Sequence, residues 1–221
     1  MNLLRRCSAE AIGTAMLLAV IVGSGIMAER LAPGQGALAL LANTLATGAG
    51  LAALILSFSA ISGAHFNPVV TLSAALRNTM PWGEVPAYCV AQVAGAMIGV
   101  AMAHIMFDLP WFSVSQHVRA GMAQGFSEFV ATFGLLVVII GCARARQSAL
   151  AFAVGAYIAA AYWFTASTGF ANPAVTLARA ASDTFSGIRP SDAPLFIAAQ
   201  LLGAVTATYY FRWLQKAELK Q

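Results

Sequence analysis

The sequence predicts an all-α integral membrane protein with six membrane-spanning helices, two re-entrant half-helices and an inverted three-plus-three repeat. Three observations predict this fold. The 221 residues are 60% hydrophobic and only 9% charged, so apolar runs long enough to cross a bilayer are expected along most of the chain. Such runs recur between breaks rich in Gly, Pro and polar residues, and an Asn-Pro motif occurs once in each half.

The apolar runs are candidate spanning helices because each approaches the roughly 20 residues that a helix needs to cross the hydrocarbon core. They cover residues 8–28, 37–60, 85–107, 123–142, 148–166 and 193–213. The first run follows Arg5 and Arg6, but Glu10 interrupts it and no small-residue cleavage site follows. We therefore interpret it as a retained transmembrane helix rather than a signal peptide.

Basic residues are unevenly divided between the two predicted sides of the membrane. If both termini are cytoplasmic, the inner side carries Arg5, Arg6, Arg77, Arg144, Arg146, Arg212, Lys216 and Lys220, and the outer side carries Arg30, Arg119, Arg179 and Arg189. Eight basic residues inside against four outside satisfy the positive-inside rule, so we expect both termini in the cytoplasm. The net charge of +4 comes from scattered residues rather than a basic block, which argues against a nucleic-acid partner.

The two halves of the chain repeat the same landmarks. The stretch "EAIGTAMLL" from Glu10 aligns with "EFVATFGLL" from Glu128, and "AQVAGA" at 91–96 aligns with "AQLLGA" at 199–204. Each half, about 5–107 and about 123–213, holds three spans, and an odd number forces the second half to enter from the opposite face. We expect one domain over 1–221 with an inverted-topology repeat, whose functional site tends to lie at the bilayer midplane.

The Asn-Pro motifs, "GAHFNPVVTL" at 63–72 and "GFANPAVTL" at 169–177, predict two half-helices. Asn is a strong N-cap and Pro suits the first helical position, so Asn67 and Asn172 should each begin a helix. A helix from Asn67 to Arg77 would be roughly 16 Å long, about half of a 30 Å hydrocarbon core. The non-helical segments 62–65 and 167–170 would then expose backbone at membrane depth, which is tolerated where it lines a wet cavity.

The cysteines and histidines do not suggest a disulfide framework or a metal site. Cys7, Cys89 and Cys142 have no CxxC spacing, and His65, His104 and His117 are equally dispersed, so we expect free thiols and no metal site or cofactor. The small residues Gly95 and Gly203 are expected to permit close helix packing.

Taken together, the paired Asn-Pro boxes and the repeated Glu and Gln-Gly landmarks resemble the aquaporin and aquaglyceroporin family over essentially the whole chain. The resemblance implies a passive channel rather than an enzyme, in a lipid bilayer, with one pore per subunit of a homotetramer. For a bacterial member this would be the inner membrane.

The resemblance also implies roles for individual residues. The pore midpoint would comprise Asn67, Pro68, Val69, Asn172, Pro173 and Ala174, and the lining loops Gly63, Ala64, His65, Thr168 and Phe170. Buried polar residues that hold the loops would be Glu10, Glu128, Gln92 and Gln200.

The outer selectivity filter departs from the family pattern. Most members have Arg directly after the second Asn-Pro-Ala, whereas this chain has Val175. Counting from the landmarks without gaps places the other filter positions at Thr47, Ala160 and Gly169. We therefore expect a wide, weakly polar, uncharged filter, which resembles that of bacterial arsenic-resistance-associated aquaglyceroporins.

The filter predicts permeation by metalloid hydroxides such as arsenite, extending to methylated arsenicals, glycerol and some water. A general water and glycerol facilitator is the alternative within the channel class, and an ion-coupled secondary transporter is the alternative outside it. Arg179 lies one helical turn beyond Val175. We expect it to pair with Asp183 or to reach the headgroups; the alternative is a displaced charge at the pore mouth that gathers anionic or strongly dipolar solutes.

Overall fold

The computed structural model describes residues 1–216, whose regular elements are helices, with no strand among these residues. The helices are α1 (Leu3–Leu31), α2 (Gly36–Ser62), α3 (Pro68–Leu76), η1 (Trp82–Glu84), α4 (Val85–Met106), α5 (Met122–Ala145), η2 (Gln147–Ala149), α6 (Leu150–Phe164), α7 (Pro173–Arg179) and α8 (Ala193–Lys216). Six segments are long and apolar enough to span a membrane, and they correspond to the six predicted runs. The predicted fold class is confirmed. Lys220 lies outside the described residues.

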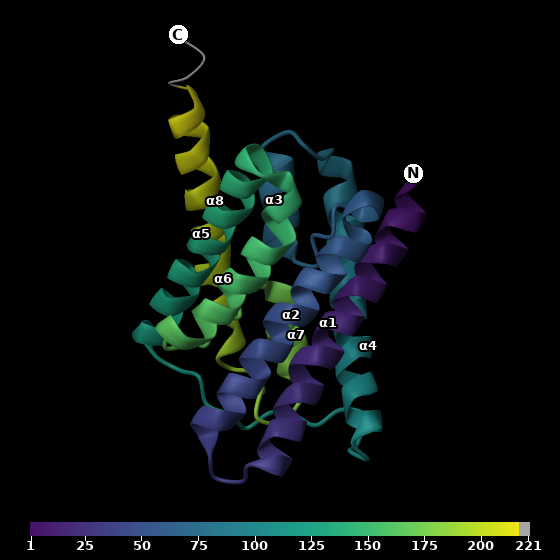
Figure 1. The fold of residues 1–221 in the computed structure, drawn as a ribbon, viewed down its shortest axis with the longest axis vertical. Helices are drawn as coiled ribbons and strands as arrows, with labels where there is room; N and C mark the ends of the chain where they lie inside the picture. Colours follow the sequence, from purple (N-terminus) through teal and green to yellow (C-terminus); the bar gives the residue numbers. More distant parts are fainter. Residues whose placement is uncertain (217–221) are drawn as a thin grey trace.

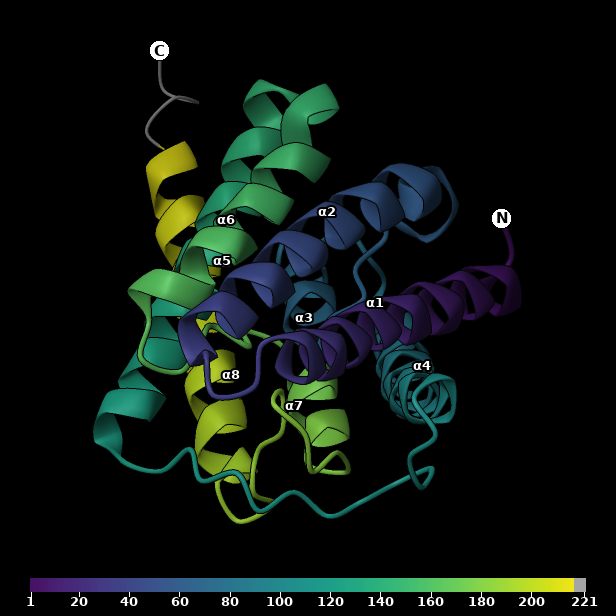
Figure 2. The same cartoon turned by 60° about the horizontal axis from the view of Figure 1, so that its bottom comes forward.

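The amino end of α1 and the carboxyl end of α8 lie at the same end of the molecule, and the α1–α2 connection lies at the other (Figure 1). Within the first half, α1 packs against α2 and α4; within the second half, α5 packs against α6 and α8. Contacts between α2 and α6 join the halves. The short helices α3 and α7 lie near the middle of the view in Figure 2, with long helices around them.

Close approach of long helices depends on glycine at two matching positions. A Cβ on Gly95 of α4 would lie 2.2 Å from the carbonyl oxygen of Ala11 in α1. A Cβ on Gly203 of α8 would lie 2.6 Å from the carbonyl oxygen of Phe129 in α5. Both distances are far below van der Waals contact, so only glycine lets these helix backbones meet.

Each half-helix follows a loop that turns sharply through left-handed backbone conformations. In the first half φ is +92° at Gly63, +51° at Ala64 and +49° at Phe66; in the second it is +63° at Thr168, +57° at Gly169 and +49° at Ala171. Such conformations are costly for residues other than glycine and persist only where the surrounding structure stabilises them. The loops are therefore constrained segments that need anchoring contacts.

The asparagines end these loops and begin the half-helices, as the motif predicts. Asn67 caps α3 by accepting the Val69 N–H at 3.0 Å. Asn172 caps α7 by accepting the N–H groups of Ala174 at 3.0 Å and Val175 at 3.3 Å. Pro68 and Pro173 each occupy the first helical position, where a missing N–H costs nothing.

Candidate pore

The two half-helices meet at their amino ends through a reciprocal pair of hydrogen bonds. The side-chain amide of Asn67 donates to the carbonyl oxygen of Ala171, and that of Asn172 donates to the carbonyl oxygen of Phe66, both at 2.8 Å. The side-chain oxygen of each asparagine accepts a backbone N–H of the helix that this asparagine caps. The orientation of both side-chain amides is therefore determined. One N–H of each amide is left to face a solute.

A buried carboxylate anchors the first loop. Glu10 of α1 accepts from the Ser62 hydroxyl at 2.6 Å, from the backbone N–H groups of His65 at 2.9 Å and Phe66 at 2.6 Å, and from the Gln92 amide at 2.8 Å. These four donors come from α2, the loop and α4. Glu10 therefore ties three segments together around the strained loop.

Glu128 of α5 anchors the second loop in the same way. It accepts from the Ser167 hydroxyl at 2.6 Å, from the backbone N–H groups of Phe170 at 2.9 Å and Ala171 at 2.8 Å, and from the Gln200 amide at 2.6 Å. Both carboxylates are 0% exposed. In each half, all four hydrogen bonds are donated to the carboxyl oxygens by N–H or O–H groups.

A cavity of about 190 Å³ passes the paired asparagines. Its lining extends from Arg77, at the carboxyl end of α3, to Arg179, at the carboxyl end of α7. Because the two half-helices point away from each other, these ends lie on opposite sides of the midpoint. The cavity therefore follows the axis along which a solute would cross the membrane.

The long helices line this cavity with residues four positions apart. Thr47, Leu51 and Ile55 of α2 face it, and α6 contributes a matching row. The α6 row comprises Leu150, Val154, Ile158 and Tyr162. A spacing of four keeps side chains on one helical face, so most of the wall is aliphatic.

The predicted filter residue Ala160 is wrong. Ala160 is exposed on the outside of α6, and Ile158 and Tyr162 line the cavity on either side of it in sequence. A displacement of two residues turns a side chain through about 200°, so a gap-free count from the motif reached the opposite helical face. The other three predicted filter residues, Thr47, Gly169 and Val175, do line the cavity.

The cavity near Thr47 is consequently lined by a bulkier and more polar side chain than predicted, because Tyr162 replaces Ala160. The Tyr162 hydroxyl donates to the Thr47 hydroxyl at 3.3 Å. Gly169 packs so closely on α6 that an added Cβ would lie 2.7 Å from the Cβ of Ala161. Glycine at this position therefore serves helix contact and left-handed backbone as much as pore width.

The expected pairing of Arg179 with Asp183 is also wrong. Arg179 is only 2% exposed, lines the cavity, and places its guanidinium carbon 3.3 Å from the centre of the Phe170 ring. Its Nε donates to the carbonyl oxygen of Ser186. Asp183 instead accepts the Gln116 backbone N–H at 2.8 Å. The side chain folds back toward the lumen, so the expected uncharged filter carries a guanidinium.

The sequence matches the family model described as Major intrinsic protein over residues 1–148 and 141–221. It is 55% identical over 213 residues to aquaglyceroporin AqpS of Rhizobium meliloti (strain 1021), covering 96% of this chain and 91% of that protein. The chain belongs to the major intrinsic protein family. It is therefore a membrane channel protein for small solutes.

Two further relatives agree with this assignment. Aquaporin Z of Bradyrhizobium diazoefficiens is 27% identical over 228 residues, covering 96% of this chain and 94% of that one. The X-ray structure of the aquaglyceroporin from Plasmodium falciparum matches with a TM-score of 0.76 at 22% identity, covering 95% of this chain and 96% of that one. At that identity the structural match supports the fold.

Among the six residues predicted at the midpoint of this major intrinsic protein, Asn67 and Asn172 line the cavity. Val69 and Ala174 are 0% exposed and pack in the hydrophobic core, and the prolines begin the half-helices. The extra bulk of Val69 is therefore placed in the core rather than in the lumen. Of the predicted loop residues, Gly63, Ala64, His65 and Phe170 line the same cavity.

Thr168 lines a second cavity, of about 250 Å³, which also contacts Arg119 and His117. Tyr162 and Arg179 border both cavities, so they separate the main passage from this outer cavity. Arg119 was predicted only as a charge on the outer side. No local motif marks it, because residues 107–121 reach the pore mouth as an irregular loop.

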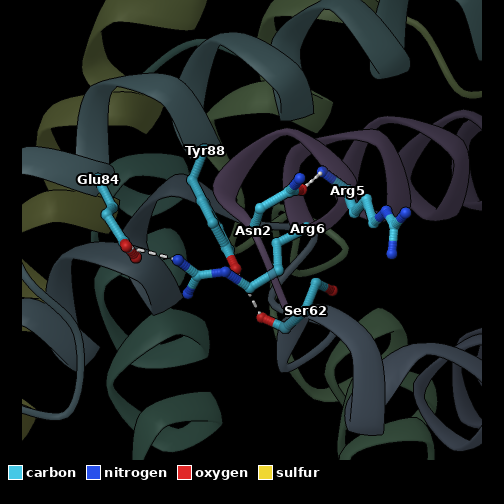
Figure 3. Close-up of polar contacts among 6 residues, drawn as sticks. All are labelled: Asn2, Arg5, Arg6, Ser62, Glu84 and Tyr88. Carbon is cyan, nitrogen blue, oxygen red and sulfur yellow. Dashed lines mark hydrogen bonds and ion pairs between the residues drawn. The ribbon is translucent and has the colours of Figure 1, made fainter.

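Near the amino end of α1, polar side chains that are far apart in sequence contact one another (Figure 3). Arg6 donates to Glu84 at 2.5 Å, and Tyr88 donates to the carbonyl oxygen of Ser62 at 2.9 Å. His65 lines the cavity and contacts the Thr71 hydroxyl through Nδ1 at 3.0 Å. Within residues 1–216, no group of three or more His, Cys, Asp or Glu side chains could hold a metal ion.

Proposed function

We propose that this protein is a passive channel whose main permeants are metalloid hydroxides such as arsenite. Methylated arsenicals, glycerol and some water complete the proposed set. The observation that carries the proposal is the character of the passage: a mostly aliphatic wall with a few fixed polar groups and Val175 in the place where most family members have Arg.

A solute in such a passage needs a compact shape and hydroxyl groups spaced along it. The amides of Asn67 and Asn172 offer donors at the midpoint, and the hydroxyls of Thr47 and Tyr162 offer donors or acceptors farther out. Leu51 and Val154 also line the cavity and offer no side-chain hydrogen bonds. Arsenous acid is uncharged and carries several hydroxyl groups, so it can exchange hydration for these few partners.

A general water and glycerol facilitator is the second candidate. It is favoured by Tyr162 and Arg179, which line the cavity and supply hydroxyl and guanidinium donors that suit small polyols as well as water. The two candidates differ in the ratio of arsenite to glycerol and water permeability, so a direct comparison of these solutes separates them.

The hydrogen bonds of the buried carboxylates argue against coupled transport. An ion-coupled mechanism needs an ionisable group that can change partners near the midpoint. Glu10 and Glu128 are the carboxylates closest to the half-helix tips, and each is engaged by four donors. If either carboxyl took up a proton, one of its acceptor oxygens would become an O–H donor facing another donor. The loop that this carboxyl holds would then loosen.

Stopped-flow permeability of proteoliposomes tests the proposal. We expect arsenite and glycerol to cross faster than in protein-free vesicles and water to gain less. The variants Asn67→Leu and Asn172→Leu each remove a donor and a cap, the cap alone being worth about 1 kcal/mol, so flux of all three solutes should fall. Arsenite flux no greater than in empty vesicles, beside clear glycerol flux, would favour the general facilitator.

The same vesicles discriminate against a transporter. With and without an imposed proton or sodium gradient, a passive channel brings arsenite to the same internal concentration as outside. Accumulation above that level would overturn the channel proposal. We further propose a homotetramer in the inner membrane of a bacterium with both termini cytoplasmic, which protease accessibility in oriented vesicles can check.

A further inference from the structure

The outer cavity differs in chemistry from the aliphatic passage below it. Its polar lining comes from Asn43, His117, Arg119, Tyr162, Thr168 and Arg179. At about 250 Å³ it can hold a small ion with several waters, since one water occupies about 30 Å³ of liquid. Two arginines on one cavity of this size concentrate positive charge in a small volume.

Both guanidinium groups are held in place by the same aromatic ring. The guanidinium carbon of Arg179 lies 3.3 Å from the centre of the Phe170 ring, and that of Arg119 lies 5.0 Å from it. The residues are 2% and 9% exposed. They come from α7 and from the loop before α5, so the tertiary fold brings together two cations that are distant in sequence.

Neutral carbonyl groups, rather than carboxylates, hold these side chains. Arg119 donates through Nε to the Gly187 carbonyl oxygen at 2.8 Å and through Nη1 to the Ser167 carbonyl oxygen at 3.3 Å and the Thr168 hydroxyl at 3.4 Å. Arg179 donates through Nε to Ser186. Among the described residues, no hydrogen bond engages Nη1 or Nη2 of Arg179 or Nη2 of Arg119. Three terminal nitrogens thus remain for a ligand.

The nearby carboxylates are committed elsewhere. Asp183 accepts the Gln116 N–H, and Asp192 accepts the backbone N–H of Arg119 and pairs with Arg189 at 2.8 Å. Glu128 is engaged by three donors of the second loop and by Gln200 of α8. In the described chain, neither guanidinium therefore has an ion-pair partner.

The charge on this pair persists at neutral pH. Burial lowers the pKa of Arg119 to about 10, which still leaves the group protonated. Burial also lowers the pKa of His117, and the two arginines lower it further, so the imidazole adds no charge at pH 7. Buried charges are costly unless compensated, and planar guanidinium groups bind oxyanions through paired N–H donors.

We propose that Arg119 and Arg179 form a binding site for a small tetrahedral oxyanion in the outer cavity. The anion accepts hydrogen bonds from the free terminal nitrogens of both residues and compensates their charge. This site lies beyond the passage for neutral solutes, and its occupancy does not depend on which of them permeates.

Sulfate is a suitable probe because its charge stays constant across the working pH range. Isothermal titration of the purified full-length protein at low ionic strength should show saturable sulfate binding, and both Arg179→Gln and Arg119→Gln should weaken it at least tenfold. Arg30→Gln is the matched control: it removes one positive charge from an exposed residue that donates to the Phe107 carbonyl oxygen outside this cavity. The control should bind sulfate as the parent does.

A second measurement protects the test against misfolding of the glutamine variants. Crystals of the parent protein soaked in selenate should give an anomalous selenium peak within hydrogen-bond distance of terminal nitrogens of both Arg119 and Arg179. Absence of saturable sulfate binding by the parent would overturn the proposal. So would a well-folded Arg179→Gln variant that binds sulfate with parental affinity, or a selenate soak without a peak between the two guanidinium groups.

Discussion

The two halves of this protein share one scaffold but not one lining. Glu10 and Glu128 each accept one serine hydroxyl, two consecutive backbone N–H groups and one glutamine amide, and all eight distances lie between 2.6 and 2.9 Å. Gln92 and Gln200 also donate to Thr71 and Thr176, both at 2.9 Å. The contacts that hold the loops are thus the same in both halves.

The side chains that face the solute differ between the halves. Two residues before the capping asparagine, the first half has His65 and the second has Phe170. Seven residues after it, the first half has Ala74 and the second has Arg179. The repeated residues therefore support the loops, whereas the residues that diverge set the chemistry at the two ends of the passage.

The largest effect is expected from removing either anchor. Glu10→Ala or Glu128→Ala would leave four donors without their acceptor around a strained loop. Because an unsatisfied buried donor costs about 1–3 kcal/mol, each variant should lose more than about 3 kcal/mol of stability. Thermal unfolding of the detergent-solubilised protein, followed by size-exclusion chromatography, measures the loss.

Glu84→Ala is the control for this comparison, since it removes a part-exposed carboxylate that, within residues 1–216, pairs only with Arg6. It should change stability little, because exposed ion pairs contribute about 0–1 kcal/mol. If one of the two anchor variants were as stable as the parent, the two halves would not share an equivalent scaffold.

A smaller loss is expected at the paired glycines. Gly95→Ala and Gly203→Ala would each press a methyl group against a backbone carbonyl oxygen of the neighbouring helix, and overpacking of this kind typically costs about 1–3 kcal/mol. The first contact is tighter, at 2.2 Å against 2.6 Å, so Gly95→Ala should be the more damaging. Melting temperatures of both variants sharpen the comparison, and a reversed order would contradict it.

An arginine substitution should change solute selectivity differently at matching positions of the two halves. Val175→Arg would add a long cation beside Arg179 and narrow the outer end, so glycerol and arsenite permeability should fall about tenfold more than water permeability, or about 1.4 kcal/mol in barrier. Val70 occupies the corresponding position of the first half and also lines the cavity. Val70→Arg is the matched variant, without a neighbouring arginine one turn later.

Tetramer yield must be measured for both arginine variants, because an unpaired Arg buried in packing would misfold the chain. A well-folded Val175→Arg protein with parental permeability to water, glycerol and arsenite would show that this position does not control selectivity. Equal loss of all three would reject selection by size.

The smallest effect concerns His117, whose pKa is lowered by burial and by Arg119 and Arg179, with Asp183 acting in the opposite direction. A bound anion favours the imidazolium form, so sulfate should raise the pKa of His117 toward its ordinary value near 6.5. By linkage, sulfate affinity should increase as pH falls through that pKa. NMR titration of the ring with and without sulfate measures the shift; His117→Gln should abolish the pH dependence of sulfate affinity.

Much of the site could be predicted from short-range pattern. The Asn-Pro pairs mark helix caps because capping depends on neighbouring residues, and Asn67 and Asn172 indeed begin α3 and α7. The row Thr47, Leu51 and Ile55 carries a visible spacing of four, as does the row on α6. Ala160 is out of phase with the α6 row, since it lies two residues from both Ile158 and Tyr162.

The helices, their repeat and the residues where they begin can be predicted from the sequence, because hydrophobic length and capping are local properties. Packing between distant segments sets which helical faces meet the lumen and where long side chains point. Arg179 turns back over Phe170, and Arg119 arrives from an irregular loop to join it. Neither placement follows from spacing along the chain, because it depends on packing between segments that are far apart in sequence.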